Sequence, residues 1–155
     1  MTWLRRIATV ALVLCASRPV AADRRNGLYL EALGKGGLWG LGYDRRLARR
    51  VSIGVVGSGF SSEGQRYVSL SPYLGLYLAR HGRSAWFADG GAMLVRTWAD
   101  SPVPEWPGET SSGAAGIISS GYEFRGRLIF RVFVHGVIGK GGALPWVGLG
   151  LGWAF

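Results

Sequence analysis

Five side chains that could do chemistry lie within otherwise apolar stretches of this sequence. They are two glutamates, an aspartate, an arginine and a histidine: Glu31, Asp89, Glu123, Arg131 and His135. Carboxylates and a guanidinium that are held together away from water pair with one another, because an unpaired buried charge is costly. We expect an interior salt-bridge network. A proton site or a ligand site built from the same groups is the alternative.

His135 also raises the possibility of nucleophilic catalysis. A hydrolase that modifies membrane lipids needs a serine, a histidine and an acid in contact. The preceding apolar segment offers only Ser119 and Ser120 as serines, and Glu31 could supply the acid. Because these residues are scattered along the chain, we expect no enzyme and keep the hydrolase as an alternative. The sequence contains no recognisable metal-ligand set and predicts no cofactor.

The motif Gly-Lys-Gly-Gly occurs twice, at Gly34–Gly37 and at Gly139–Gly142. A loop that cradles phosphate leads into a helix and has serine or threonine directly after its lysine. Neither copy has these features. We therefore predict two tight turns, in which glycine supplies the positive φ angle.

The segments that carry the charged residues alternate with a period of two, which is typical of β-strands. The 26 glycines are spread through every segment and disfavour helices. Most of the alternating segments suit the about nine to eleven residues with which a tilted strand crosses a bilayer. We predict eight strands, at Gly27–Gly34, Leu38–Asp44, Val51–Phe60, Arg66–Ala79, Ser84–Trp98, Gly113–Phe124, Arg127–Ile138 and Trp146–Phe155.

Each predicted strand has one apolar face and one face of small or polar residues. A soluble barrel or sandwich turns its apolar face inward and has a charged exterior. Here the second face is mostly glycine and serine, which suits a crowded interior, while large apolar side chains would contact lipid. The pattern predicts an all-β fold, an eight-stranded antiparallel up-and-down transmembrane β-barrel with a plugged lumen. A soluble periplasmic lipocalin-like binding barrel is the alternative.

Connection length and charge alternate along the chain. The fifth connection, Ala99–Ser112, is the longest and contains three acids, and its Trp106 is a candidate exposed anchor. Membrane barrels have short periplasmic turns and longer outer loops. Anionic phospholipids would attract basic turns on the periplasmic side. We expect this role for the arginines of the second, fourth and sixth connections, Arg45, Arg46, Arg49, Arg50, Arg80, Arg83, Arg125 and Arg127.

The first 22 residues have the features of a secretory signal peptide. Two arginines, Arg5 and Arg6, precede an apolar run, and small residues end the segment. We expect cleavage before Asp23, which leaves residues 23–155 as the barrel domain. The chain has a formal net charge of +9, but export makes a nucleic-acid partner improbable.

The last ten residues resemble the C-terminal strand of the small bacterial outer-membrane β-barrels. In that family this strand is the signal that the barrel-assembly machinery reads, with a glycine five residues and a hydrophobic residue two residues before a terminal aromatic. Gly150, Trp153 and Phe155 occupy these positions. The resemblance implies an outer-membrane location, contact with outer-membrane lipids and passage through the assembly machinery, and we expect a monomer.

A looser resemblance covers nearly the whole exported part of the chain. The stretches YLEALGKGGLWGLGYDRRL and SPYLGLYLARHG are similar to a group of exported barrels to which no activity is attached. We therefore expect a non-enzymatic outer-membrane protein that serves envelope structure or surface contact through its outer loops.

Overall fold

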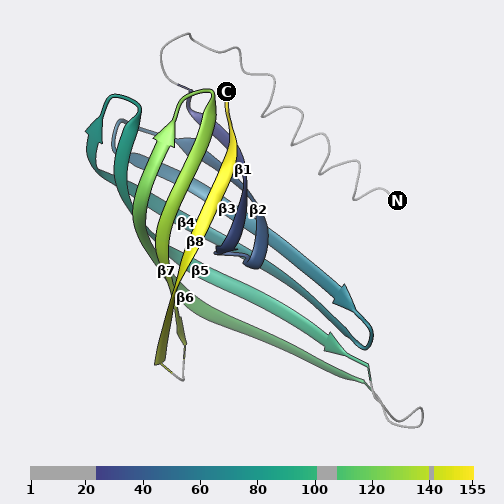
Figure 1. Cartoon of the computed structure of the whole chain (residues 1–155). Coiled ribbons are helices and arrows are strands. Elements are labelled where there is room, and N and C mark those ends of the chain that lie inside the picture. Colours follow the sequence, from purple (N-terminus) through teal and green to yellow (C-terminus); the bar gives the residue numbers. More distant parts are fainter. Residues whose placement is uncertain (1–23, 101–107, 140–141) are drawn as a thin grey trace.

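The computed structural model describes residues 24–100, 108–139 and 142–155, so the predicted signal peptide and Trp106 lie outside the described residues. Eight strands form a closed barrel (Figure 1). Among the described residues, no helix is long and apolar enough to cross a membrane. The strands are β1 (Asn26–Gly34), β2 (Gly37–Arg46), β3 (Val51–Ser62), β4 (Gln65–His81), β5 (Ser84–Ala99), β6 (Glu109–Arg125), β7 (Leu128–Gly139) and β8 (Gly142–Ala154).

Each strand pairs antiparallel with its neighbours in the sequence, and β1 pairs with β8, so the sheet is a closed up-and-down barrel. The backbone amide and carbonyl of Asn26 bond to those of Phe155, both at 3.0 Å, at the seam between β1 and β8. The predicted fold is confirmed. One end of the barrel, called the turn end below, holds the β2–β3, β4–β5 and β6–β7 turns and residue Phe155 (Figure 1).

All eight predicted strands are present, and the largest differences in their bounds lie at the starts of β6 and β8. β6 begins at Glu109, which pairs with Ala99, and β8 begins at Gly142, which pairs with Gly139. The partner strand forms hydrogen bonds with the backbone groups of these residues. Pairing therefore continues where the side chains show no clear alternation of apolar and polar residues.

The two faces of the sheet divide as the alternation predicts. Large apolar side chains point outward, with Leu74 60% exposed and Leu151 63% exposed. This is the opposite of a soluble barrel and suits a surface that contacts lipid. Inside, two apolar clusters fill the cross-section: Tyr29, Val56, Tyr73 and Ile117 form one, and Tyr77, Ala85, Phe87 and Phe133 form the other.

Glycines on the inner face make room for the interior aromatic rings. A Cβ added at Gly42 would overlap the Tyr29 ring, and a Cβ added at Gly54 would overlap the Tyr73 ring. The narrow barrel therefore alternates large and small side chains across its interior, as small closed barrels do.

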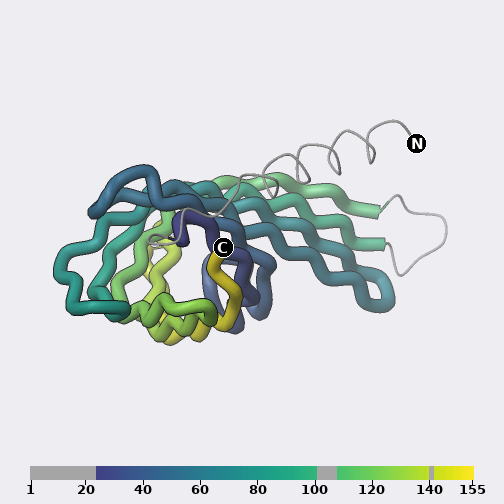
Figure 2. The backbone as a smooth tube through the Cα atoms, turned by 90° about the horizontal axis from the view of Figure 1, so that it is seen from above, coloured from purple at the N-terminus to yellow at the C-terminus, as the bar shows by residue number. Residues whose placement is uncertain are grey.

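The sheet continues past the barrel on one side. β2 pairs with β3 only as far as Gly57, and β7 pairs with β6 only as far as Gly116. Beyond these points β3, β4, β5 and β6 pair only among themselves, over residues 58–62, 65–69, 95–99 and 109–113. We call these residues the sheet extension. Figures 1 and 2 show it projecting from the barrel at the end opposite the turn end.

Candidate functional site

The barrel interior near the turn end contains a dense group of ion pairs, called the turn-side cluster. Arg46 Nη2 lies 2.7 Å from Glu123 Oε1, and Arg125 Nη2 lies 2.6 Å from Asp44 Oδ2. Arg131 bridges the two carboxylates, donating from Nε to Glu123 Oε2 at 2.6 Å and pairing with Asp44. All five side chains are buried, so each charge is stabilised by its partners rather than by water.

Strand geometry explains why these residues meet. Residues two apart on a strand share a face, so Arg46 follows Asp44 into the lumen and Arg125 follows Glu123. The register of β6 and β7 pairs Glu123 directly with Arg131. The turn-side cluster therefore comes from only three strands, β2, β6 and β7.

Aromatic rings complete the surroundings of the turn-side cluster. The Tyr77 hydroxyl donates to Glu123 Oε1 at 3.1 Å. The Arg46 guanidinium lies 4.5 Å from the centre of the Tyr77 ring, and the Arg131 guanidinium lies 4.3 Å from the centre of the Tyr29 ring. These distances are typical of cation–π contacts, which are strongest where water is excluded.

A second group of charges, called the mid-barrel cluster, surrounds Lys35. The Lys35 ammonium lies 3.2 Å from Glu31 Oε1 and 3.1 Å from Asp89 Oδ2. It also lies 4.7 Å and 4.8 Å from the ring centres of Tyr73 and Phe133. The side chain is 0% exposed. Lys35 is a residue of the β1–β2 turn, and this turn therefore contributes to the barrel interior.

Three polar side chains form a row across adjacent strands beside the mid-barrel cluster. The register pairs Asp89 with Ser119 and Ser119 with His135. Ser119 Oγ lies 2.9 Å from His135 Nδ1. Within the described part of the chain, His135 Nε2 and Asp89 Oδ1 are buried without a hydrogen-bond partner. A Ser-His-Asp triad has serine and acid on opposite ring nitrogens. In this row the acid lies beside the serine instead.

The charges of the two clusters are distributed unevenly. The turn-side cluster has three guanidiniums and two carboxylates, whereas the mid-barrel cluster has one ammonium and two carboxylates. Between them, the hydroxyls of Tyr29 and Tyr73 share a hydrogen bond of 2.6 Å. The described interior pairs are thus balanced as a whole, with an excess of positive charge toward the turn end.

The structure buries all five residues that the sequence singled out, but divides them between two sites. Glu123 and Arg131 belong to the turn-side cluster, and Glu31, Asp89 and His135 lie in or beside the mid-barrel cluster. Arg96, on β5, is exposed, and its guanidinium lies 5.2 Å from the centre of the Trp98 ring.

We predicted that Arg46 and Arg125 belong to basic turns, but their side chains are buried in the lumen. They are the last residues of β2 and β6, and their side chains enter the lumen because the strands continue beyond their predicted ends. The period of two could have identified both, since each lies two positions after a buried acid. Asp44 was placed in a strand but not recognised as a partner, and no local signal identifies Lys35.

The other six predicted arginines, which are Arg45, Arg49, Arg50, Arg80, Arg83 and Arg127, lie exposed at the turn end. Their placement on the periplasmic side stays a prediction.

Of the predicted assembly signal, Gly150 faces inward opposite Glu31 and Arg131. Trp153 is on the outer face, with the Arg127 guanidinium 4.4 Å from its ring centre.

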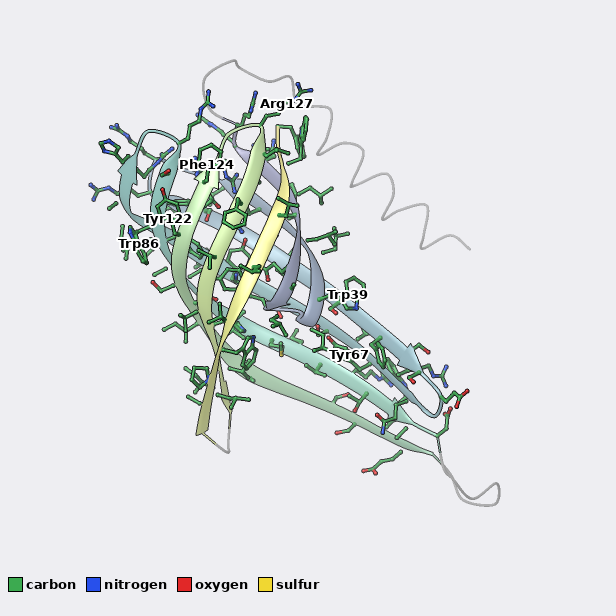
Figure 3. All side chains as sticks on the ribbon, in the orientation of Figure 1. Trp39, Tyr67, Trp86, Tyr122, Phe124 and Arg127 are labelled. Carbon is green, nitrogen blue, oxygen red and sulfur yellow. The ribbon has the colours of Figure 1, made fainter. Side chains whose placement is uncertain are left out.

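Aromatic side chains lie on the outside of the barrel. Figure 3 shows Trp86, Tyr122 and Phe124 toward the turn end and Trp39 farther along the barrel. The rings of Trp86 and Tyr122 meet edge to face at 6.2 Å. Such amphipathic rings suit the two boundaries of a bilayer.

The described residues contain no group of three His, Cys, Asp or Glu side chains that could hold a metal ion. The interior side chains described above form ion pairs and hydrogen bonds.

Comparisons with known proteins support the same architecture. No protein-family model and no curated protein matches the chain. The structure is similar to the N-terminal β-barrel domain of OprF from Pseudomonas aeruginosa, with a TM-score of 0.61 and 13% identity, over 84% of this chain and 96% of that one. It is also similar to Ail, the attachment invasion locus protein of Yersinia pestis, with a TM-score of 0.53 and 12% identity, over 84% of this chain and 94% of that one.

A structure of Ail with the heparin analogue sucrose octasulfate has a TM-score of 0.50 and 12% identity, with coverage of 84% and 94%. At these identities the likeness shows the fold alone. The chain has the fold of the eight-stranded bacterial outer-membrane barrels, as its C-terminal strand led us to expect. That fold supports an outer-membrane location and contact with lipid.

Proposed function

We propose that this protein is a monomeric, non-enzymatic outer-membrane barrel with a plugged lumen, which acts through the surface of its sheet extension. The observation that carries the proposal is the contrast between its two halves. Interior ion pairs and aromatic rings occupy the barrel, while four strands continue past it and offer a broad exposed surface.

The plugged lumen is supported by the large side chains that lie inside the barrel along its axis. The two charged clusters flank the Tyr29–Tyr73 hydrogen bond, and Phe87 and Phe133 pack edge to face at 6.3 Å. An eight-stranded barrel has an interior just wide enough for side chains to fill. An ion would have to displace paired charges to pass.

Surface contact is supported by the composition of the sheet extension. Phe60 is exposed, and the guanidinium of Arg96 lies over the Trp98 ring. A shallow groove of about 540 Å³ is lined by Gly59, Phe60, Ser61, Arg66, Tyr67, Val68 and Trp98. Aromatic and arginine side chains are enriched at protein interfaces. Ail, whose fold is similar, is the attachment invasion locus protein of Yersinia pestis, which agrees with a role of this kind.

We further propose that the protein has no hydrolase activity. Ser119 and His135 are in contact, but both are buried inside the barrel. Among the described residues, no carboxylate bonds to His135 Nε2, the nitrogen that an orienting acid would use here. The dyad is better explained as part of the hydrogen bonding of the interior.

Cysteine labelling of intact cells tests the location and orientation. The sequence has one cysteine, Cys15, in the predicted signal peptide, so an introduced thiol is the only one in the exported chain. We expect Ser62→Cys, at the end of β3 in the sheet extension, to react with a membrane-impermeant maleimide on intact cells. His81→Cys, at the turn end, should react only after the outer membrane is permeabilised. The reverse order, or equal reaction of both, contradicts the proposal.

A further inference from the structure

A hollow at the turn end gathers four arginine residues. It has a volume of about 550 Å³ and is lined by Arg25, Arg46, Leu47, Ala48, Arg49, Arg80 and Gly82. No carboxylate lines it within the described part of the chain. We call it the arginine hollow. Four like charges around one space repel each other unless an anion lies between them.

The fold holds the arginine hollow in shape. Arg46 N donates to Arg25 O at 2.7 Å, and Leu47 N donates to Val51 O at 2.9 Å. The side chain of Arg80 donates from Nη1 to the backbone carbonyl of Arg49 at 2.8 Å and so ties the end of β4 to the β2–β3 turn. The hollow is therefore a built feature, formed by hydrogen-bonded turns rather than by loose side chains alone.

Arg46 connects the arginine hollow to the barrel interior. Its side chain is 7% exposed, and its Nη2 is committed to Glu123. Its Nε is buried and has no hydrogen-bond partner among the described residues. A buried donor without a partner costs free energy. Arg46 also lines the hollow, so a shift of its side chain would bring this donor to an acceptor bound there.

The surrounding charge favours the same kind of occupant. With Arg46 included, the turn-side cluster has one more guanidinium than carboxylates. Arg25, Arg49 and Arg80 add three further positive charges at the mouth. Guanidiniums present planar pairs of donors that match phosphate oxygens, and such charge-assisted bonds are among the strongest in proteins.

We propose that the arginine hollow binds a phosphate group, with the side chains of Arg25, Arg46, Arg49 and Arg80 as donors. The group is supplied either by the headgroup of an anionic phospholipid or by a free phosphate compound. This site is independent of the sheet extension and of the function proposed for it. It also assigns a specific task to some of the turn arginines, beyond a general attraction to anionic lipid.

The test compares two double variants with equal loss of charge. Arg49→Gln with Arg80→Gln removes two exposed arginines of the hollow and leaves the buried Arg46 in place. Arg45→Gln with Arg83→Gln removes two exposed arginines of the same barrel end that do not line it. Cold and boiled gel mobility first establishes that each variant folds. Inorganic phosphate is then titrated by calorimetry into the folded protein in a maltoside detergent, at constant ionic strength.

We expect Arg49→Gln with Arg80→Gln to weaken phosphate binding at least about tenfold, and the control pair to change it less than about twofold. Native mass spectrometry with phosphatidylglycerol or phosphatidylcholine in the micelles distinguishes the sources. Selective retention of phosphatidylglycerol, lost only in the hollow variant, assigns a lipid headgroup, whereas phosphate binding without lipid retention assigns a free compound. Equal weakening in both variants, or no binding of either probe to the wild-type protein, overturns the proposal.

Discussion

At the scale of single residues, the barrel interior depends on close pairing of rings with glycines. Gly54 on β3 faces the Tyr73 ring. The hydroxyl of Tyr73 shares a hydrogen bond of 2.6 Å with the hydroxyl of Tyr29. Gly57, on the outer face of the same strand, has nothing within 4 Å of the position where a Cβ would be. The two positions therefore form a matched pair for measuring how tightly the interior is packed.

We predict that Gly54→Ala lowers the free energy of unfolding by about 1–3 kcal/mol, because the added methyl group forces the Tyr73 ring to move. Gly57→Ala should leave stability unchanged or raise it by about 0.5 kcal/mol, since alanine costs less than glycine in a strand. Urea unfolding of the refolded protein in lipid vesicles, followed by tryptophan fluorescence, gives both values. Equal effects of the two substitutions contradict the packing argument.

The buried charges make a second prediction at the residue scale. Glu123 is the carboxylate that contacts Arg46, Arg125 and Arg131. Glu123→Gln leaves three buried guanidiniums with Asp44 as the one carboxylate of the turn-side cluster. We expect a loss of about 3–5 kcal/mol in the free energy of unfolding, or failure to fold.

Glu109→Gln is the control for this change, since it makes the same substitution on the same strand at an exposed position. We expect it to change stability by less than about 0.5 kcal/mol. If both variants unfold at the same urea concentration, the turn-side cluster does not hold the barrel together.

At the scale of elements, the seam between β1 and β8 closes the sheet. Its turn end is formed by Phe155, which exchanges two backbone hydrogen bonds of 3.0 Å with Asn26. A barrel has no free edges only while this seam is paired. The residues of the predicted assembly signal therefore lie on β8, one of the two strands of this seam, and at its end.

We predict that deletion of Phe155 lowers the folded fraction in cells, measured as the band whose gel mobility changes on boiling. Phe155→Tyr keeps a terminal aromatic and should behave as the wild-type protein does. Refolding of the deleted chain in detergent separates two causes. Normal refolding there with failure in cells indicates a lost assembly signal, and failure in both indicates a weakened seam. Normal folding in both would show that Phe155 is dispensable.

At the scale of the whole molecule, we assign stability to the barrel interior and surface contact to the sheet extension. The interior holds the barrel together, while the extension and the arginine hollow lie at opposite ends and can act independently. Because the apolar outer face runs between these two ends, our proposal places each end on a different side of a bilayer.

We predict that the purified protein produces no stepwise conductance in a planar bilayer, because the paired side chains leave no continuous path for ions. A wide bacterial porin measured under the same conditions is the positive control, and an equal amount of detergent is the negative control. Discrete openings that disappear when the protein is omitted would contradict the plugged lumen.

The sequence by itself determined the number of strands, their faces and most of the residues that point inward. These properties follow from a period of two, which is local and can be read within ten residues. For the same reason, the positions of Glu31, Asp89, Glu123, Arg131 and His135 in the interior were predictable. Arg46 and Arg125 were missed because the strand ends were placed too early.

Only the tertiary structure decided which of these side chains meet. Contact between Ser119 and His135, or between Arg131 and Asp44, depends on the register between strands and on the closure of the sheet. Neither property is encoded in a local pattern, because a shift of register by two residues keeps every side chain on its own face. The burial of Lys35 likewise depends on where neighbouring strands end, and so do the sheet extension and the arginine hollow. The ends of the strands are set by pairing between segments that lie far apart in the sequence.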